Sequence, residues 1–297
     1  MSRRTRGACR GTRALPTGRR GDAVAIVASV IAGCAAALVF SGARADTSGP
    51  GTAAVSAAAP EVSAGVRRSG LEDLQPATRA MQLDDGQNPG MLWVIEGESA
   101  WARRPDPAAP SCADCHDDAR RTMRGVAARY PAFDAGLARP VDLGQRIDLC
   151  RTRHQGTAPF GPETAPRLQL EAFVAHQSRG LPIAPPDDAR LAEFRARGAL
   201  QYRTRMGQLD LACADCHDRN AGRRLGGSLI PQGHPTGYPI YRLEWQAAGS
   251  LQRRLRGCLT GVRAQPHAYD AVEAVELQLH LMRRAAGMPI ETPAVRP

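Results

Sequence analysis

The chain has 297 residues, of which 43% are hydrophobic and only 4% are aromatic. This length suffices for two small domains, each with a core of its own. The formal net charge is +10, but residues 1–45 contain eight arginines and one acidic residue, so the rest of the chain carries only 10 − 7 = +3. So small an excess does not indicate a nucleic-acid partner, and we expect none.

The N-terminal segment has the order of an export signal. An arginine-rich stretch precedes an apolar run over residues 23–40, and a small-residue site over 43–45 follows directly. This order predicts a signal peptide over 1–45 and a periplasmic protein that is not stably inserted in a membrane after cleavage. The apolar run is long for a signal core, so retention as a membrane anchor is the alternative. Residues 46–70 are rich in Ala, Ser, Gly and Pro, which predicts a flexible linker.

Two copies of the pentad Cys-Ala-Asp-Cys-His, at 112–116 and 213–217, are the strongest motif in the chain. In C-x-x-C-H the two thiols attach to haem and the adjacent histidine supplies one axial nitrogen to iron. A thioredoxin-like pair or half a zinc site would not require a histidine directly after the second cysteine. We therefore predict two covalently bound haem c groups. The predicted attachment residues are Cys112, Cys115, Cys213 and Cys216, and the predicted axial ligands are His116 and His217.

The chain repeats itself beyond these pentads. Tyr130-Pro131 lies 20 residues before Cys150, and Tyr238-Pro239 lies 20 residues before Cys258. An arginine also stands four residues ahead of each of these cysteines. Repeats of about a hundred residues have the size of a whole domain. We predict two domains, over 71–185 and 186–297, with the active site in the second.

The fold class follows from the segments between the motifs. Apolar residues recur at helical spacing near the end of each repeat, at Leu170, Phe173 and Val174 and again at Leu277, Leu281 and Met282. These segments predict two closing helices. Alternating strand patterns are scarce, and loops rich in Gly and Pro are frequent. We therefore expect a mainly α protein made of two tandem cytochrome c-like domains with long loops, each around one covalent haem.

The third cysteine of each repeat, Cys150 and Cys258, is the most informative residue after the pentads. In an exported protein two remaining cysteines could form a disulfide. However, a residue duplicated together with its domain most simply works inside that domain. We therefore favour Cys150 and Cys258 as distal thiolate ligands of the two haem irons. An anionic sulfur stabilises ferric iron, so both haems should have low potentials.

Methionine and histidine are the competing distal ligands. Met123, Met206, Met282 and Met288 lack equivalents at matching repeat positions. The same holds for His154, His176, His234, His267 and His280. We expect these residues in the core or on the surface, and note His234 because it precedes the second Tyr-Pro.

With these motifs in place, the chain closely resembles the diheme form of the SoxA family, the cytochrome subunit of the periplasmic thiosulfate-oxidising Sox system. The resemblance covers residues 88–297. Its most specific part begins at Gln232-Gly-His-Pro-Thr236, continues through the stretch 238–246 and ends at Arg254-x-x-x-Cys258.

The resemblance implies an L-cysteine S-thiosulfotransferase, which joins thiosulfate oxidatively to a cysteine of a carrier protein. It implies that Cys258 is the active-site cysteine, modified as a persulfide, and a distal haem ligand. It also implies that Arg254 binds the substrate anion and that Cys150 is the distal ligand of the first haem. The implied partners are a small monohaem SoxX-like cytochrome, forming a heterodimer, and a SoxYZ-like sulfur carrier.

Three other interpretations compete with this one. The first is a non-catalytic periplasmic diheme electron-transfer cytochrome. The second is a diheme peroxidase, which would need an open iron site. The third is a binding module in which Cys150 and Cys258 form a disulfide.

Overall fold

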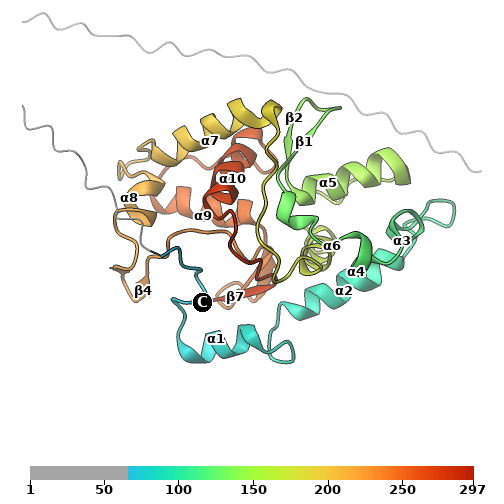
Figure 1. The fold of residues 1–297 in the computed structure, drawn as a ribbon, viewed down its shortest axis with the longest axis horizontal. Helices are drawn as coiled ribbons and strands as arrows, with labels where there is room; N and C mark the ends of the chain where they lie inside the picture. The colour runs from blue at the N-terminus through green and yellow to red at the C-terminus, as the bar shows by residue number, and fades with distance from the viewer. Residues whose placement is uncertain (1–65) are drawn as a thin grey trace, which may run out of the picture. The chain divides into compact units, whose positions relative to one another are not determined.

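The computed structural model describes residues 66–297, and Figure 1 shows their arrangement. The predicted signal peptide and the linker up to residue 65 lie outside the described residues. The α-helices are α1 (Pro76–Leu83), α2 (Met91–Ala102), α3 (Cys112–His116), α4 (Ala119–Thr122), α5 (Leu143–Cys150), α6 (Ala165–His176), α7 (Ala192–Arg203), α8 (Cys213–His217), α9 (Leu251–Gly261) and α10 (Val272–Arg284). The short turns η1 (Ala127–Arg129) and η3 (Ala189–Leu191) are 3-10 helices, and η2 (Arg151–Gln155) is a π-helical turn. The mainly α expectation is confirmed.

Two helix pairs dominate the packing. Helix α2 packs along α6, and α7 packs along α10. Both contacts are close because a glycine faces the partner backbone: a Cβ on Gly97 would lie 2.1 Å from the carbonyl oxygen of Gln169, and one on Gly198 would lie 1.9 Å from that of Glu276. The two predicted closing helices are confirmed as α6 and α10. Each packs against the helix that precedes its half's pentad.

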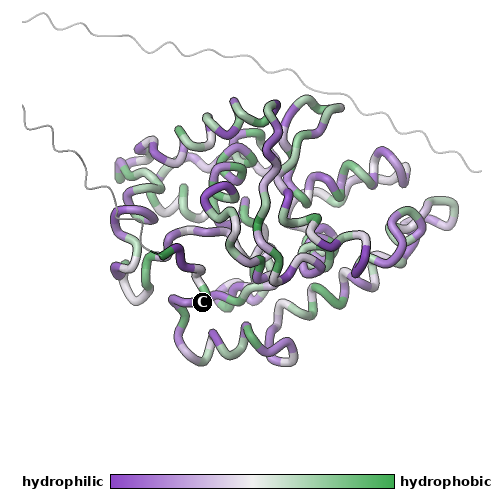
Figure 2. Tube along the Cα trace, in the orientation of Figure 1, coloured by the Kyte–Doolittle hydropathy of each residue, from purple (hydrophilic) through white to green (hydrophobic). Residues whose placement is uncertain are grey.

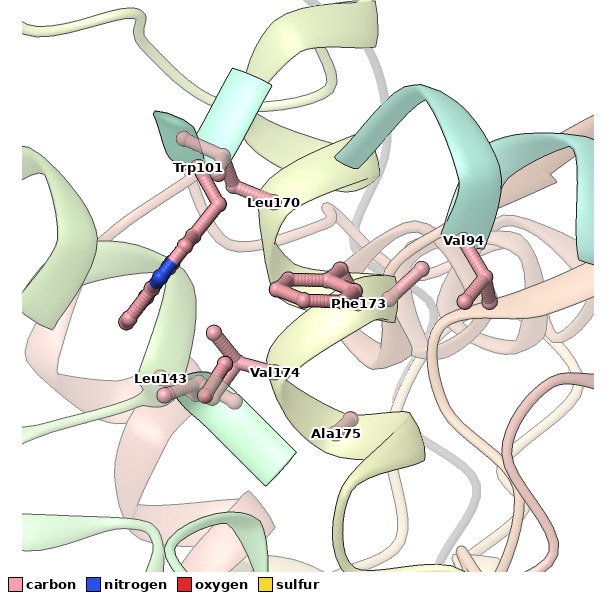
Figure 3. Packing of buried hydrophobic residues seen from close by; sticks show 9 residues of the cluster. Val94, Trp101, Leu143, Leu170, Phe173, Val174 and Ala175 are labelled. Carbon is pink, nitrogen blue, oxygen red and sulfur yellow. The ribbon is translucent and has the colours of Figure 1, made fainter. Parts of the chain in front are cut away.

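The core of the first half lies between α2 and α6. Trp101 of α2 and Phe173 of α6 are both buried, with ring centroids 5.8 Å apart. Leu143 from α5 and Val174 complete this cluster, which Figure 3 shows from close by. In the second half, Tyr202 of α7 packs with leucines of α10. The aromatic residue stands four positions after the close-packed glycine in both halves, so the repeat extends further upstream than the sequence motifs indicated.

The strands are short and also repeat. Strand β1 (Ala132–Asp134) pairs antiparallel with β2 (Arg139–Val141), and β5 (Ile240–Arg242) pairs antiparallel with β6 (Ala247–Gly249). The C-terminal strand β7 (Ala294–Arg296) adds in parallel to β5. A further exposed hairpin consists of β3 (Arg224–Leu225) and β4 (Ser228–Leu229). The β1–β2 hairpin leads directly into α5, and the β5–β6 hairpin leads directly into α9. These are the two helices that carry a third cysteine.

A buried polar network joins the starts of those two cysteine-bearing helices. Asp142 caps the first turn of α5, and its carboxylate also accepts a hydrogen bond from Gln252 in the first turn of α9, at 2.6 Å. Arg167 of α6 donates two hydrogen bonds to Asp270, at 2.8 and 2.9 Å, and lies 3.5 Å from Asp142. Such a network fixes one helix start against the other because its partners are withdrawn from water.

Figure 2 shows hydrophilic and hydrophobic residues interspersed along the helices. Within residues 66–297, the structure contains no helix with both the length and the apolar character needed to cross a membrane. Ser69, in the last residues of the predicted linker, is buried and donates a hydrogen bond to Glu291 at 2.5 Å.

Candidate functional site

Each pentad forms a single helical turn, α3 or α8, capped by its own aspartate. In α3 the Asp114 carboxylate accepts a hydrogen bond from the Ser111 backbone, at 2.8 Å, while the Ser111 hydroxyl accepts one from the Asp114 backbone. In α8 the carboxylate of Asp215 accepts one from the backbone of Ala212, at 2.9 Å. This capping places two thiols and an imidazole on one turn. The aspartate in each CADCH pentad therefore has a structural role.

A cavity of about 300 Å³ lies beside α8 in the second half. Cys213, His217, Arg254 and Cys258 line it together, so the structure brings four of the predicted site residues to one place. The apolar part of its wall includes Leu251, Leu255, Leu277 and Leu281. A planar apolar group with a central cation would find both sulfur and nitrogen donors here.

His217 and Cys258 lie next to one another in this cavity. Nδ1 of His217 lies 2.8 Å from the carbonyl oxygen of Pro231, so Nδ1–H donates there and Nε2 is left as the free ring nitrogen. Burial alone would raise the pKa of the Cys258 thiol, but a hydrogen bond with His217 and the charge of Arg254 together hold that pKa below its ordinary value. The sulfur of Cys258 is therefore biased toward the thiolate.

Four arginines line the same cavity; one of them, Arg224, is exposed on β3, and the other three stand at its polar wall. Arg254 lies one helical turn before Cys258 on α9, Arg242 ends β5, and Arg296 ends β7. Burial lowers the pKa of the Arg242 guanidinium, and the neighbouring charge of Arg254 lowers it further. Arg242 lies 3.0 Å from Glu244, which is itself largely exposed, and Arg296 lies 3.5 Å from Glu291. The cavity thus carries concentrated positive charge near a nucleophilic sulfur.

The first half has the same arrangement of helices and strands, but different charges surround its third cysteine, Cys150. Cys150 lies close enough to Cys112 and Cys115 for their charges to influence one another's pKa values. Burial raises the pKa of Cys150, and the nearby Arg146 only partly opposes this rise. All six cysteines of the described residues are free, and Cys150 and Cys258 are not bonded to one another. This counts against the disulfide-linked binding module.

The competing methionines and histidines lie mostly elsewhere. Met123 packs against the first core, Met282 and Met288 pack near Ile183, and Met206 pairs through its backbone with Leu211. Of the five additional histidines, His234 lines the cavity around Cys258, where burial lowers its pKa to about 4. His280 packs against the ring of Tyr202, 5.0 Å away. His234 is therefore a neutral wall residue near neutral pH.

Arg242 is one of the cavity residues that sequence reasoning missed. It lies within the stretch 238–246, which was singled out as a whole without assigning it a role. The repeat held the signal, because extending the alignment from Tyr130 and Tyr238 sets Asp134 of the first half against Arg242. A reversal of charge at a matched position would have marked the two sites as chemically different.

The donor set fits a covalently bound haem. The residues 66–297 contain no cluster of three or more His, Cys, Asp or Glu side chains that would hold a free metal ion. What they contain instead is a pair of thiols on one helical turn, a histidine with Nε2 free, and an opposing cysteine in a leucine-lined cavity. These are the donors that haem c requires.

The fold and the site define a c-type cytochrome. Residues 96–183 match the family model described as SoxA/TsdA, cytochrome c domain. The L-cysteine S-thiosulfotransferase subunit SoxA of Pseudaminobacter salicylatoxidans is 36% identical over 220 residues, which cover 74% of this chain and 77% of the relative. The subunit of the same name from Rhodovulum sulfidophilum is 34% identical, covering 77% of this chain and 80% of the relative.

A solved structure agrees with these relatives. The crystal structure of SoxXA from P. pantotrophus superposes with a TM-score of 0.75 at 28% identity, covering 78% of this chain and 87% of that chain. The chain therefore belongs to the SoxA family, and it binds haem c covalently.

Proposed function

We propose that the cavity around Cys258 is the site at which this SoxA-family chain joins thiosulfate to a cysteine of a sulfur-carrier protein. The relatives bear the name L-cysteine S-thiosulfotransferase subunit, and the same transferase activity belongs to this chain. The single observation that carries the site assignment is the meeting of Cys258, His217 and Arg254 in one cavity. In the first half, the matched arginine, Arg146, is paired with the carboxylate of Asp134.

The reaction balances as a two-electron oxidation. A carrier thiol, R–SH, and thiosulfate, S–SO₃²⁻, form R–S–S–SO₃⁻, with release of one proton and two electrons. One S–S bond forms, and the sulfane sulfur and the thiol sulfur are oxidised. When bound, haem would supply a one-electron acceptor, so the two electrons would pass to the second haem of this chain and the haem of the monohaem partner.

The residues of the cavity have separable tasks in this proposal. Arg254 binds the sulfonate oxygens through its planar fork of N–H donors, because a guanidinium matches an oxyanion bidentately. Cys258, modified as a persulfide as the resemblance implies, lies beside the bound thiosulfate, where the S–S bond between the sulfane sulfur and the carrier thiol forms. His217, with its tautomer set by Pro231, and Cys258 would hold the iron of the second haem.

The first half belongs to the same proposal as a second haem site. Cys112 and Cys115 would hold this haem covalently, and His116 and Cys150 would hold its iron. The repeated glycine-aromatic helix, pentad, hairpin and cysteine helix support two tandem cytochrome c-like domains. We place them at 71–185 and 186–297.

Partner and location follow from the same family. The solved relative is a SoxXA complex, which supports a heterodimer of this chain with a small monohaem SoxX-like cytochrome. The acceptor substrate is a SoxYZ-like carrier whose cysteine enters the second cavity. Covalent haem c and the N-terminal signal pattern support a periplasmic location after removal of residues 1–45.

Replacement of Cys258 by alanine tests the assignment. In the haem-loaded complex we expect Cys258→Ala to abolish thiosulfate conjugation to the carrier, measured by the mass of the carrier protein. The matched change Cys150→Ala should retain conjugation, because that cysteine lies in the other half. If the Cys258→Ala complex conjugates thiosulfate as fast as the unmodified complex, Cys258 has no role beyond electron transfer and the assignment of the active site to this cavity fails.

A further inference from the structure

The two halves place residues of opposite charge at one equivalent position. In β1–β2 Ala132 pairs with Val141 and Asp134 with Arg139; in β5–β6 Ile240 pairs with Gly249 and Arg242 with Ala247. The two registers are the same, counted from Tyr130 and Tyr238 respectively. Asp134 and Arg242 are thus the last strand residues of matched hairpins, and each lies beside the helix that carries the third cysteine.

In the first half, Asp134 neutralises the arginine that precedes the third cysteine. Its buried carboxylate lies 2.8 Å from Arg146. It also accepts two hydrogen bonds from Arg153, at 2.8 and 2.9 Å. Both oxygens of Asp134 and the fork of Arg153 are therefore occupied. An external anion would have to compete with a buried carboxylate for these donors.

In the second half the corresponding arginine has no such partner. Arg254, the counterpart of Arg146, makes no ion pair or side-chain hydrogen bond with any residue in 66–297, and Gly261 stands where Arg153 stands in the first half. Arg242 stands at the repeat position of Asp134 and lines the cavity. Its side chain is only 13% exposed, and its Nη2 lies 3.0 Å from the exposed Glu244. Its Nε is buried and has no hydrogen-bond partner.

The cavity therefore holds a buried N–H donor without a partner, on Arg242, and an unpaired guanidinium, on Arg254. Together these groups suit the binding of an anion. Leaving a buried N–H unsatisfied is costly, so an oxyanion that reaches it gains more than it would on the surface. Two guanidinium groups offer enough N–H donors for all three oxygens of a sulfonate.

We propose that Arg242 binds the sulfonate of thiosulfate together with Arg254, and that the exchange of Asp134 for arginine at this repeat position makes the second cavity the anion site. This inference rests on the proposed function for its substrate. It adds a substrate-binding residue on β5, and it predicts that the first half, whose Arg146 and Arg153 are already paired with Asp134, is not a thiosulfate site.

The test measures anion binding directly and separately from turnover. Sulfate is the probe, because it is an unreactive dianion with the same oxygen face. Its dissociation constant is determined by calorimetric titration of the ferric complex with the monohaem partner, and the KM for thiosulfate is measured in parallel. We expect Arg242→Gln to weaken sulfate binding and to raise the KM by about 10- to 100-fold, the range for hydrogen bonds to charged groups.

The matched control is Arg283→Gln, which removes the same charge from an exposed position on α10. It should leave the sulfate affinity and the KM at the wild-type values. If Arg242→Gln binds sulfate as tightly as Arg283→Gln does, the inference is wrong. A wild-type complex that forms no conjugate would instead overturn the proposed function, while the sulfate titration would still judge Arg242.

Arg242→Asp recreates the charge of the first half. The new carboxylate should pair with Arg254 as Asp134 pairs with Arg146, so the loss of sulfate binding should be at least as large as in Arg242→Gln. Retained binding in Arg242→Asp would contradict the inference. The haem content of each variant is compared first, and if Arg242→Gln loses haem, Arg242→Lys takes its place. Lysine lacks the bidentate fork, so we expect weaker sulfate binding in that variant. Unchanged sulfate affinity in Arg242→Lys would likewise refute the proposal.

Discussion

Glu171 is the most strongly perturbed acid outside the haem sites. It lies on α6, one turn after Arg167, but the donors of that arginine are directed at Asp270, Asp148 and Asp142. Glu171 lines a separate, smaller cavity that is not the one around Cys258, and it receives no hydrogen bond from these donors. Burial, reinforced by the negative charge of Asp142, raises the pKa of Glu171 to about 8.

This pKa predicts how stability depends on pH. Glu171 takes up its proton in the folded state at a higher pH than in the unfolded chain, where the pKa is about 4.5. The contribution of Glu171 to the free energy of unfolding is therefore most favourable below pH 4.5, and it is lost progressively as the pH rises to about 8. We expect Glu171→Gln to stabilise the protein by a few kcal/mol at about pH 8 and above, and to have little effect below pH 4.5, in thermal unfolding followed across pH.

Glu96→Gln, an exposed change on α2, gives the baseline for this substitution. A Glu171→Gln stabilisation that is equal at pH 4 and pH 8 would contradict the assigned pKa.

At the level of single residues, the sequence indicated the haem-binding and sulfur residues because they carry rare chemistry at fixed spacing. Arg242, Glu171 and Arg167 were not predicted. Their roles depend on which charges face them across the fold, and an arginine or a glutamate on its own carries no such information. Only the comparison of the two halves, Asp134 against Arg242, could have shown one of these before the structure.

At the level of elements, helices with a long apolar face were predictable and short strands were not. The closing helices α6 and α10 bury apolar residues at helical spacing, which the sequence displays directly. Strands β1, β2, β5 and β6 have three residues each, too few for an alternating pattern to be visible. They form because a turn brings them together ahead of a capped helix.

The close helix crossing at Gly198 gives a prediction at this scale. A methyl group there would meet the backbone of α10, which cannot give way as a side chain would. We expect Gly198→Ala to lower stability by about 3 kcal/mol or more, seen as a drop in the thermal midpoint of the haem-loaded chain. Gly257→Ala is the matched control, since nothing lies within 4 Å of its added Cβ. That change should raise stability by roughly 0.5–1 kcal/mol, because alanine favours a helix; equal midpoints for the two variants would show that the crossing is not tight.

At the level of the whole molecule, the repeat explains both the likeness and the difference of the two sites. Each half builds the same sequence of helix, pentad, hairpin and cysteine helix, and the network around Asp142 ties the starts of α5 and α9 together. The sequence revealed the duplication through its cysteines and Tyr-Pro pairs. It could not reveal this network, because Asp142, Arg167, Gln252 and Asp270 come from four separated segments that only folding brings together.

The central claim is that each third cysteine places its sulfur opposite the histidine of its own pentad. The most direct test is electron paramagnetic resonance of the ferric, haem-loaded chain, compared with Cys150→Met and Cys258→Met. We predict two low-spin haem signals with thiolate opposite histidine, of which Cys150→Met changes only one and Cys258→Met only the other. Signals of methionine or a second histidine at both irons of the unmodified chain, unaffected by either substitution, would contradict the account.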